Sequence, residues 1–170
     1  TAITGDVVFD KVTFSYGDKV IFSELSFRVP WRETTLMPIR PGMGRTTILK
    51  ILTRVYAQHS GAIRYGETDS TDVDPWNIRR AIAIVSESLP LLGTTIFEAI
   101  SYGRQSDRKK KAVALLDRIQ QGERRDIVRM NIDEPIGELG RALSTAQKMQ
   151  LMYARALLSD KPYLFIEDDL

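Results

Sequence analysis

A glycine-rich stretch, residues 38–52, constrains the fold of this chain more than any other part of the sequence. A tight Pro/Gly loop, Ile39–Gly44, leads into a basic residue and two hydroxyl residues, Arg45–Thr47, and then into apolar residues at helical spacing. The apolar run before the loop, Thr34–Met37, predicts the end of a buried strand. A strand, a glycine loop and a helix in this order form a phosphate cradle, because backbone N–H groups and the positive end of a helix then face the anion.

The spacing of this stretch nearly fits the phosphate-binding pattern G-x-x-x-x-G-K-[ST]. Gly44 and Thr46 occupy their expected positions. Ile39, however, stands at the first glycine and Arg45 at the lysine. Taken alone, the same residues also fit an ordinary strand–turn–helix corner, in which Gly42 and Gly44 serve only the turn. The motifs in the remainder of the chain therefore have to decide between the two interpretations.

Composition excludes several classes of protein. The 170 residues, 43% hydrophobic and 27% charged, suit one globular domain with a sizeable core. A net charge of +2 is too balanced to indicate a nucleic-acid surface, so we expect no nucleic-acid partner. The chain has no cysteine, which excludes disulfides and thiolate metal sites. Its longest uncharged run, Ser88–Phe97, is too short to cross a bilayer. Because it starts at Thr1 and stops at Leu170 shortly after an apolar run, we expect it to be a fragment of a longer protein.

The first half of the chain is rich in strand patterns. Residues 7–29 predict an antiparallel hairpin region with a turn at Gly17–Asp18. After the first helix, residues 61–66 predict a short strand, and Asp74–Trp76 predicts a helix that begins with an aspartate cap and a proline in its first turn. Ala81–Val85 is an apolar run of strand length, as expected of a buried parallel strand.

The second half is mostly helical. Helices are predicted from Thr95, over Ser106–Gln121 and over Ser144–Leu158. The basic run Arg108–Lys111 on the second of these would suit a nucleic acid or a membrane, but a solvated helix face explains it better because no aromatic residues interleave with the charges. A final buried strand, Tyr163–Ile166, runs into acidic residues. This order predicts an α/β sheet with an inserted helical subdomain.

The last strand and the segment before it carry a specific resemblance. Four apolar residues followed by Glu167, Asp168 and Asp169 have the plan of a Walker B strand, in which one acid holds Mg²⁺ and the next orients the attacking water. Leu143–Gln147, with Ala154–Leu157 in the helix that follows, resembles the signature region of ATP-binding cassette (ABC) transporters, usually LSGGQ and ARAL. Four further segments match family motifs in the same order: Phe14–Tyr16 (the adenine-stacking loop), Val85–Glu87 (the Q-loop), Gly93–Ile100, and Pro135–Glu138.

The resemblance, which spans the whole chain, implies the fold. It implies a single nucleotide-binding domain over residues 1–170, expected to be truncated before the switch-histidine region. The domain would be an α/β P-loop NTPase with a RecA-like core, an antiparallel β subdomain and an inserted α-helical subdomain. Residues 1–93 would form the β subdomain and the P-loop part of the core, 94–158 the helical subdomain and signature helix, and 159–170 the Walker B strand. His59, the only histidine, lies in a polar loop and is expected to be a surface residue.

The same resemblance implies a site for ATP and Mg²⁺, built from four groups of residues. Tyr16 would stack on adenine. Phosphates would bind to Gly42, Met43, Gly44, Arg45, Thr46 and Thr47. A second domain's nucleotide would be contacted by Ser144, Thr145, Ala146 and Gln147. The metal ligands would be Thr46, Glu87 and Glu167, and the catalytic residues Asp168 and Glu87; as an alternative, Glu87 is an ordinary surface acid.

Each motif departs from the family pattern. A guanidinium at Arg45 is not equivalent to an ammonium in a fitted phosphate site. Ile39 would be strained if its position needs a positive φ. Thr145–Ala146 replaces two glycines and adds Cβ atoms where a phosphate should dock. Glu167–Asp168 reverses the usual order of the acids, which misplaces the water-orienting carboxylate by about 1 Å. We therefore expect weak or absent hydrolysis, since a misplacement of that size can cost about a hundredfold in rate.

Three functions follow from these motifs. The favoured one is the ATP-binding domain of an exporter-type ABC transporter, which binds Mg-ATP and couples nucleotide-dependent dimerisation to export, with little hydrolysis of its own. The first alternative is a fully active transport ATPase, and the second is a scaffold domain that binds no nucleotide. The implied partners are a second nucleotide-binding domain, head to tail in a homo- or heterodimer, and a transmembrane domain. The implied location is the cytoplasmic face of a membrane.

Overall fold

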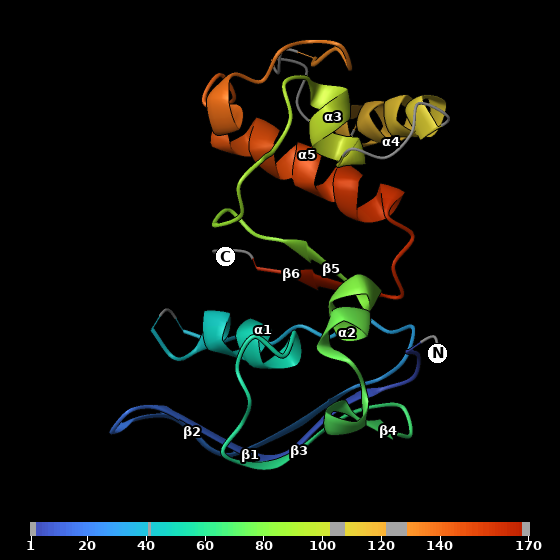
Figure 1. Cartoon of the computed structure of the whole chain (residues 1–170). Helices are drawn as coiled ribbons and strands as arrows, with labels where there is room; N and C mark the ends of the chain where they lie inside the picture. Colours follow the sequence, from blue (N-terminus) through green and yellow to red (C-terminus); the bar gives the residue numbers. More distant parts are fainter. Residues whose placement is uncertain (1–2, 41, 103–107, 122–128, 168–170) are drawn as a thin grey trace. The chain divides into compact units, whose positions relative to one another are not determined.

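The computed structural model describes residues 3–40, 42–102, 108–121 and 129–167 (Figure 1). The chain divides into two compact units, Thr1–Ile82 (the N-terminal unit) and Ala83–Leu170 (the C-terminal unit), and each unit is described by itself. The subdomain boundaries expected from the sequence, at residues 93 and 158, stay a prediction.

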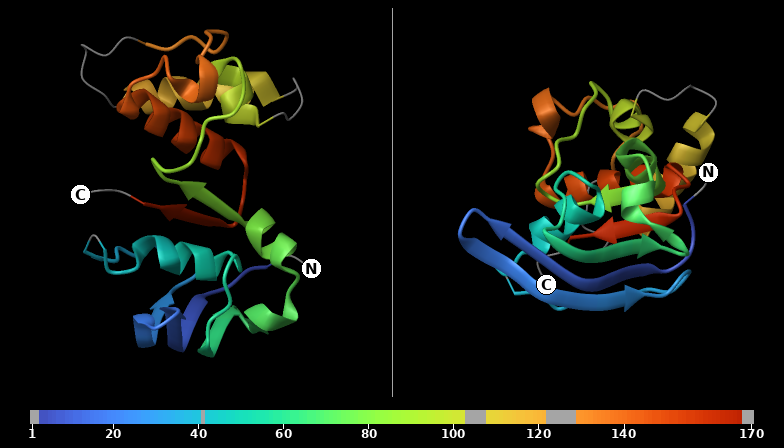
Figure 2. Two further views of the ribbon diagram at one scale, coloured as in Figure 1. Left: turned by 60° about the vertical axis from the view of Figure 1, so that its left-hand side comes forward. Right: turned by 60° about the horizontal axis from the view of Figure 1, so that its bottom comes forward.

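The N-terminal unit is built on a four-stranded antiparallel sheet (Figure 2). In the order β2-β1-β3-β4, its strands are Lys19–Val29, Val7–Tyr16, Ser60–Tyr65 and Thr68–Asp69. Tyr16 pairs with Lys19 across Gly17–Asp18, which confirms the predicted hairpin and its turn. The strand predicted over residues 61–66 is also confirmed, as β3.

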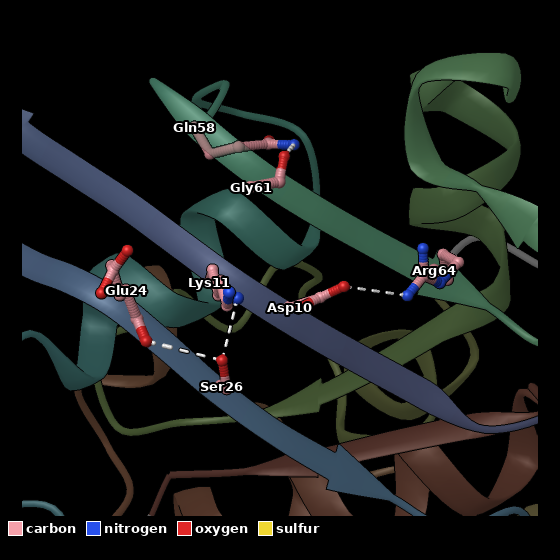
Figure 3. Close-up of polar contacts among 7 residues, drawn as sticks. All are labelled: Asp10, Lys11, Glu24, Ser26, Gln58, Gly61 and Arg64. Atoms are coloured by element: carbon pink, nitrogen blue, oxygen red, sulfur yellow. Dashed lines mark hydrogen bonds and ion pairs between the residues drawn. The ribbon is translucent and has the colours of Figure 1, made fainter.

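Burial in β1 follows the strand period with an interruption. Val7, Phe9, Val12 and Phe14 are buried, and the shift from odd to even positions coincides with an irregularity in register between Phe9 and Val12. At this bulge Lys11 adopts a positive φ of 48°, and its N–H donates to the Ser26 hydroxyl at 2.8 Å (Figure 3). A bulge inserts one residue and thereby turns the following side chains to the opposite face, which keeps the apolar ones inside.

A glycine opposite the bulge lets β3 approach it. Gly61 has a φ of 82°, and a Cβ atom there would lie 2.3 Å from the Lys11 carbonyl oxygen. Arg64, further along β3, reaches Asp10 at 3.2 Å across the two strands (Figure 3). The pair is largely exposed and therefore contributes little to stability.

The described part of the N-terminal unit also contains three helical segments: α1 (Arg45–Leu52), the 3₁₀ turn η1 (Ser70–Asp72) and α2 (Pro75–Ala81). The predicted start of α2 is confirmed, because the Trp76 N–H donates to the Asp74 carboxylate at 2.7 Å and Pro75 fills the first turn. Arg79 of α2 donates to the carbonyl oxygens of Thr53 and Arg54 at 3.0 and 2.9 Å. α2 thus satisfies carbonyl groups that the end of α1 leaves unpaired.

The strand expected before the glycine loop is not formed. Thr34–Met37 has no regular secondary structure, and Leu36 is 75% exposed. The prediction rested on apolar content alone, and an apolar run becomes a strand only where a neighbouring strand completes its hydrogen bonds. Among the described residues of this unit, Thr34–Met37 is not one of the strands that the sheet pairs.

The C-terminal unit contains the paired strands β5 (Ile82–Val85, whose first residue ends the N-terminal unit) and β6 (Tyr163–Ile166). Its helical segments are α3 (Ile96–Ser101), α4 (Lys109–Gln121), the 3₁₀ turn η3 (Glu138–Gly140) and α5 (Thr145–Leu158). The final strand forms as predicted, but its burial was overestimated: Leu164 and Ile166 are 47% and 44% exposed.

One apolar core joins α3, α4 and α5. Its fully or nearly fully buried members include Ile96, Ile100, Leu116, Leu151 and Met152. The segment at residues 132–136 adds Ile132 and Ile136 and is held by backbone hydrogen bonds to residues 94–97. The motif that precedes the signature is therefore fixed against the start of α3.

The basic run Arg108–Lys111, at the start of α4, has a structural explanation. Lys109 pairs with Asp133 at 2.5 Å and Lys111 with Asp160 at 2.8 Å, while Arg108 donates to the Leu158 carbonyl oxygen at the end of α5. Two lysines and an arginine of the run therefore fasten α4 to neighbouring segments of its own unit. Within the described ranges, none of the helices is both long and apolar enough to span a membrane.

Candidate functional site

The glycine loop is closed by backbone conformations that favour glycine. Gly42 and Gly44 have φ values of 81° and 87°, in the left-handed region. The Met43 N–H donates to the Arg40 carbonyl oxygen at 3.1 Å, which makes the loop turn tightly before α1 begins. A Cβ atom at position 44 would lie 2.5 Å from Cζ of Phe22, so the loop also packs against β2. Glycine is therefore needed at position 44 for two reasons: the positive φ of the backbone and the lack of space for a side chain.

The loop delivers a helix N-terminus suited to an anion. Gly44 is the N-cap of α1, and the first turn of this helix contains no acidic residue. Arg45 is half-buried, Thr46 is exposed and Thr47 is buried, so the hydroxyl of Thr46 is the more accessible of the two. Partial positive charge at such an end favours a phosphate group. Ile39 is not among the residues with a positive φ, so the condition under which we expected strain there is not met.

Tyr16 lies beside the helix that the cradle begins. Its hydroxyl oxygen is 3.4 Å from that of Thr47, although the two residues are 31 positions apart. Its ring is nearly perpendicular to that of Phe14, at 4.9 Å between centroids, and is 40% exposed. The N-terminal unit thus places the aromatic residue expected to stack on adenine next to the residues expected to hold phosphates.

The C-terminal unit brings the Walker B and Q-loop segments together. The Glu167 N–H donates to the Val85 carbonyl oxygen at 2.8 Å, and the buried Ser86 hydroxyl donates to the Glu167 carboxylate at 2.6 Å. Ser86 in turn lies 2.8 Å from the Ser88 hydroxyl. Glu87 is exposed on the following turn. Of the predicted acids that the structure describes, Glu87 and Glu167, Glu167 is therefore the one held by the hydrogen bonds given above.

The predicted metal set is not assembled within either unit. Thr46 belongs to the N-terminal unit, whereas Glu87 and Glu167 belong to the C-terminal unit, so their joint role stays a prediction. Asp168 lies outside the described residues. In the described ranges, no group of three or more His, Cys, Asp or Glu side chains is arranged to hold a metal ion.

The signature residues open helix α5. Ser144 is its N-cap, as predicted, and forms a capping box with Gln147: the Gln147 N–H donates to the Ser144 hydroxyl at 3.2 Å, and the Ser144 N–H donates to the Gln147 side chain at 2.9 Å. Thr145 and Ala146 are exposed in the first turn. The Ser144 hydroxyl proton is not used by the box, which leaves it available to an acceptor such as a phosphate oxygen.

Sequence reasoning missed two residues near the predicted site. Ser86 has no motif of its own, and only its place before Glu87 could have indicated it. Tyr56 follows α1 and meets Tyr16 with ring centroids 5.6 Å apart, a contact that no spacing rule predicts. His59, expected on the surface, is exposed, and its ring also contacts Phe14 at 5.4 Å.

Comparisons with known proteins point to one family. A family model described as ABC transporter matches residues 22–169. The chain is 33% identical over 167 residues to the ATP-dependent lipid A-core flippase of Idiomarina loihiensis. This match covers 96% of this chain and 29% of the flippase. The chain is also 31% identical over 169 residues to the mitochondrial iron-sulfur clusters transporter ATM1 of Debaryomyces hansenii. This match covers 99% of this chain and 24% of that protein.

A solved structure points to the same family. A bacterial Atm1-family ABC exporter with ATP bound matches with a TM-score of 0.80 at 28% identity, over 98% of this chain and 29% of that chain. The chain therefore spans between 24% and 29% of the length of these proteins.

Proposed function

The chain belongs to the ABC transporter family as an ATP-binding domain of the exporter type, with the P-loop NTPase fold, and we propose that it binds Mg-ATP with little hydrolysis of its own. In the transporter, this binding would drive association with a second nucleotide-binding domain and thereby promote export. Domains of this family bind ATP, normally with Mg²⁺, and form part of a membrane transporter.

One observation carries the proposal: Tyr16 lies 3.4 Å from Thr47, in the first turn of the helix that the glycine loop caps. An aromatic ring and a helix N-terminus in this arrangement are complementary to the two ends of a nucleotide. The ring offers a stacking surface for a base, and the loop offers backbone N–H groups to phosphate oxygens. A corner that served only the chain reversal would not need an exposed aromatic side chain at this point.

The cradle residues suit the phosphates of a nucleotide, and the oxygen ligands proposed for its metal come from both units. The cradle has two left-handed glycines, and Gly42 has open space where a Cβ would stand, so a phosphate could approach the backbone there. Thr46 would offer its hydroxyl and Glu167 its carboxylate to Mg²⁺, since hard cations prefer oxygen ligands. Glu87, exposed on its turn, would contribute through a water molecule or not at all. When bound, the metal would neutralise charge on the phosphates.

Weak hydrolysis follows from loss of fit at several positions. Arg45 keeps the positive charge of the usual lysine but presents a planar fork rather than a compact ammonium. Asp168 is about one methylene shorter than the usual glutamate, which withdraws the carboxylate from the attacking water. Phosphoryl transfer depends almost entirely on positioning and electrostatic stabilisation, so such errors slow the reaction more than they weaken binding.

The partners proposed from the family are a second nucleotide-binding domain and a transmembrane domain. Each nucleotide would lie between the cradle of one copy and the signature residues of the other, head to tail. Ser144, with Thr145–Gln147, would serve the partner's nucleotide. The domain would then act at the cytoplasmic face of a membrane. An intact partner domain in a heterodimer would supply one competent site.

Calorimetric titration of the 170-residue chain with Mg-ATP tests the proposal. We expect saturable binding below millimolar ATP. Thr46→Ala should lose affinity in the presence of Mg²⁺ while its affinity for metal-free ATP stays within about twofold. Thr68→Ala, which changes an exposed threonine of β4, is the matched control. Absence of binding at millimolar Mg-ATP would overturn the proposal and favour a scaffold role, whereas turnover at several per second would favour a fully active ATPase.

A further inference from the structure

A cluster of aromatic rings surrounds Tyr16 on the N-terminal unit. The ring of Tyr56 lies 5.6 Å from that of Tyr16 at an interplanar angle of 84°, and the ring of Phe14 lies 4.9 Å from it at 89°. Phe14 and Tyr56 also contact each other, at 5.8 Å. Three rings in mutual contact restrict one another, because each perpendicular arrangement is an electrostatic minimum for the pair. Tyr16 is thus held by two neighbours as well as by the hydroxyl contact to Thr47.

Tyr56 is itself brought to this place by α1. The N–H groups of Val55 and Tyr56 donate to the Lys50 carbonyl oxygen at 2.8 and 3.2 Å, which wraps the chain around the end of the helix. Arg54 permits the wrap with a φ of 53°. The ammonium of Lys50 lies 5.5 Å from the centroid of the Tyr56 ring. Backbone and side-chain contacts to one helical turn therefore fix the ring.

One helix consequently sets both ends of the expected nucleotide site. Its N-terminus closes the glycine loop, Thr47 contacts Tyr16, and Lys50 contacts Tyr56, which lies in the segment after its last turn. A platform anchored only to the β1–β2 hairpin could shift relative to the cradle, whereas one anchored to α1 keeps a constant distance from it. Tyr56 is 39% exposed, and Tyr16 40%, so a flat ligand can reach the pair.

We propose that Tyr56 is a positioning residue for base recognition: it holds the Tyr16 ring in the orientation that receives a purine base, in register with the phosphate cradle. This inference rests on the proposed function, because it assumes that Tyr16 stacks on the base. It assigns to Tyr56 an effect on the base alone. The phosphates, which the glycine loop contacts, are bound independently of it.

The test compares a ligand that has a base with one that has none. Calorimetric titrations of the full chain use Mg-ATP and inorganic tripolyphosphate on three variants: Tyr56→Leu, Tyr56→Phe and Tyr102→Leu. Tyr56→Leu should weaken ATP binding by about threefold to tenfold, the range that an aromatic pair contributes. It should leave the affinity for tripolyphosphate within about twofold. Tyr56→Phe keeps the ring and should restore the ATP affinity.

The control is an exposed tyrosine of the other unit. Tyr102 is 59% exposed, and its ring contacts Arg155 of its own unit, so Tyr102→Leu should leave both affinities unchanged. Unchanged ATP affinity in Tyr56→Leu would overturn this inference but not the proposed function. An equal loss of affinity for ATP and tripolyphosphate would also overturn it, because that result indicates a merely structural role for Tyr56. Failure of the unmodified chain to bind ATP would instead overturn the proposed function first.

A second measurement needs no substitution. Nuclear Overhauser contacts between the ring protons of Tyr16 and Tyr56 should be present in the free chain and persist when Mg-ATP is added, while the Tyr16 ring resonances shift as the base stacks. Loss of these contacts on addition of Mg-ATP, or their absence in a folded chain that binds ATP, would overturn the inference even if Tyr56→Leu proved too unstable to titrate.

Discussion

At the scale of single residues, the glycine loop contains two glycines with the same backbone conformation and different surroundings. Gly42 and Gly44 differ by only 6° in φ, yet a Cβ would meet nothing within 4 Å at Gly42 and would overlap Phe22 at Gly44. Alanine at either position has to adopt the left-handed region, which costs about 1–2 kcal/mol. Only at Gly44 does overpacking add to this cost, by about 1–3 kcal/mol.

Gly42→Ala should therefore lower the free energy of unfolding by about 1–2 kcal/mol, and Gly44→Ala by about 2–5 kcal/mol. Urea unfolding followed by circular dichroism measures both. The comparison is internally matched, because both variants add the same methyl group at a similar φ. Equal losses would contradict the packing of the loop against β2.

Arg45 and Asp168 are the two residues whose reversion tests the expected loss of catalysis. Arg45→Lys combined with Asp168→Glu should restore a compact cation and the full reach of the carboxylate. Since a misplacement of about 1 Å can cost about a hundredfold, we expect ATP turnover to rise by tenfold or more. Phosphate release measures it, with Arg40→Lys as a control for a general effect of lysine. An unchanged rate would favour the alternative of an ATPase that tolerates its substitutions.

Ser86 donates to the carboxylate that we expect at the metal. Removal of a partner that orients a metal ligand typically lowers metal affinity by about 10–100-fold. Ser86→Ala should therefore raise the Mg²⁺ concentration needed for half-maximal ATP affinity by about tenfold, with metal-free ATP affinity unaffected. Ser88→Ala removes a hydroxyl that contacts Ser86, and it should have a smaller effect. Titration of Mg²⁺ at fixed ATP distinguishes the two, and equal effects would argue against a specific role for Ser86.

At the scale of secondary-structure elements, the sequence predicted what local chemistry determines. The hairpin turn at Gly17–Asp18, the aspartate cap of α2 and the serine cap of α5 are each specified by residues within a few positions of one another, and each is confirmed. The strand predicted over Thr34–Met37 is not formed, because a strand depends on partners distant in sequence. The Tyr16–Tyr56 and Ser86–Glu167 contacts were missed for the same reason: a hydroxyl or a ring carries no pattern that reveals what it will touch.

Hydrogen bonds at the start of α3 make the stability of the fold depend on pH in the acidic range. Thr94 donates to the Glu98 carboxylate through its hydroxyl and its N–H, both at 2.7 Å, and these hydrogen bonds lower the pKa of Glu98. A lowered folded-state pKa gives stability that is complete above the unfolded pKa of about 4.3 and is lost as pH falls through the folded value.

Glu98→Gln should therefore flatten the fall in melting temperature between about pH 5 and pH 3, because glutamine does not titrate. Thermal melts across this range measure the effect. Glu67→Gln, at an exposed turn of the N-terminal unit, is the control for loss of a carboxylate. An acid limb as steep in Glu98→Gln as in the unmodified chain would contradict the role of these hydrogen bonds.

At the scale of the whole molecule, a domain with eroded motifs still carries the parts that a second domain would need. The signature segment starts α5 with a complete capping box, so the helix end is formed before any partner arrives. What has changed is its surface: Thr145 and Ala146 are exposed and carry side chains where the family has glycines. Nucleotide-dependent association should therefore be limited by steric contact at these two positions rather than by folding of the helix.

Replacement of both residues by glycine tests this limit. Thr145→Gly with Ala146→Gly should increase association in the presence of Mg-ATP, seen as a larger sedimentation coefficient. Without nucleotide, the sedimentation coefficient should stay that of the unmodified chain. The same change should destabilise α5 by up to about 2 kcal/mol, because glycine costs up to about 1 kcal/mol per helical position. Thr68→Gly with Ala62→Gly, on β4 and β3, controls for glycine itself. Association that rises without nucleotide would indicate non-specific aggregation of a partly unfolded chain. Association that does not rise with Mg-ATP would show that the signature residues do not limit dimerisation.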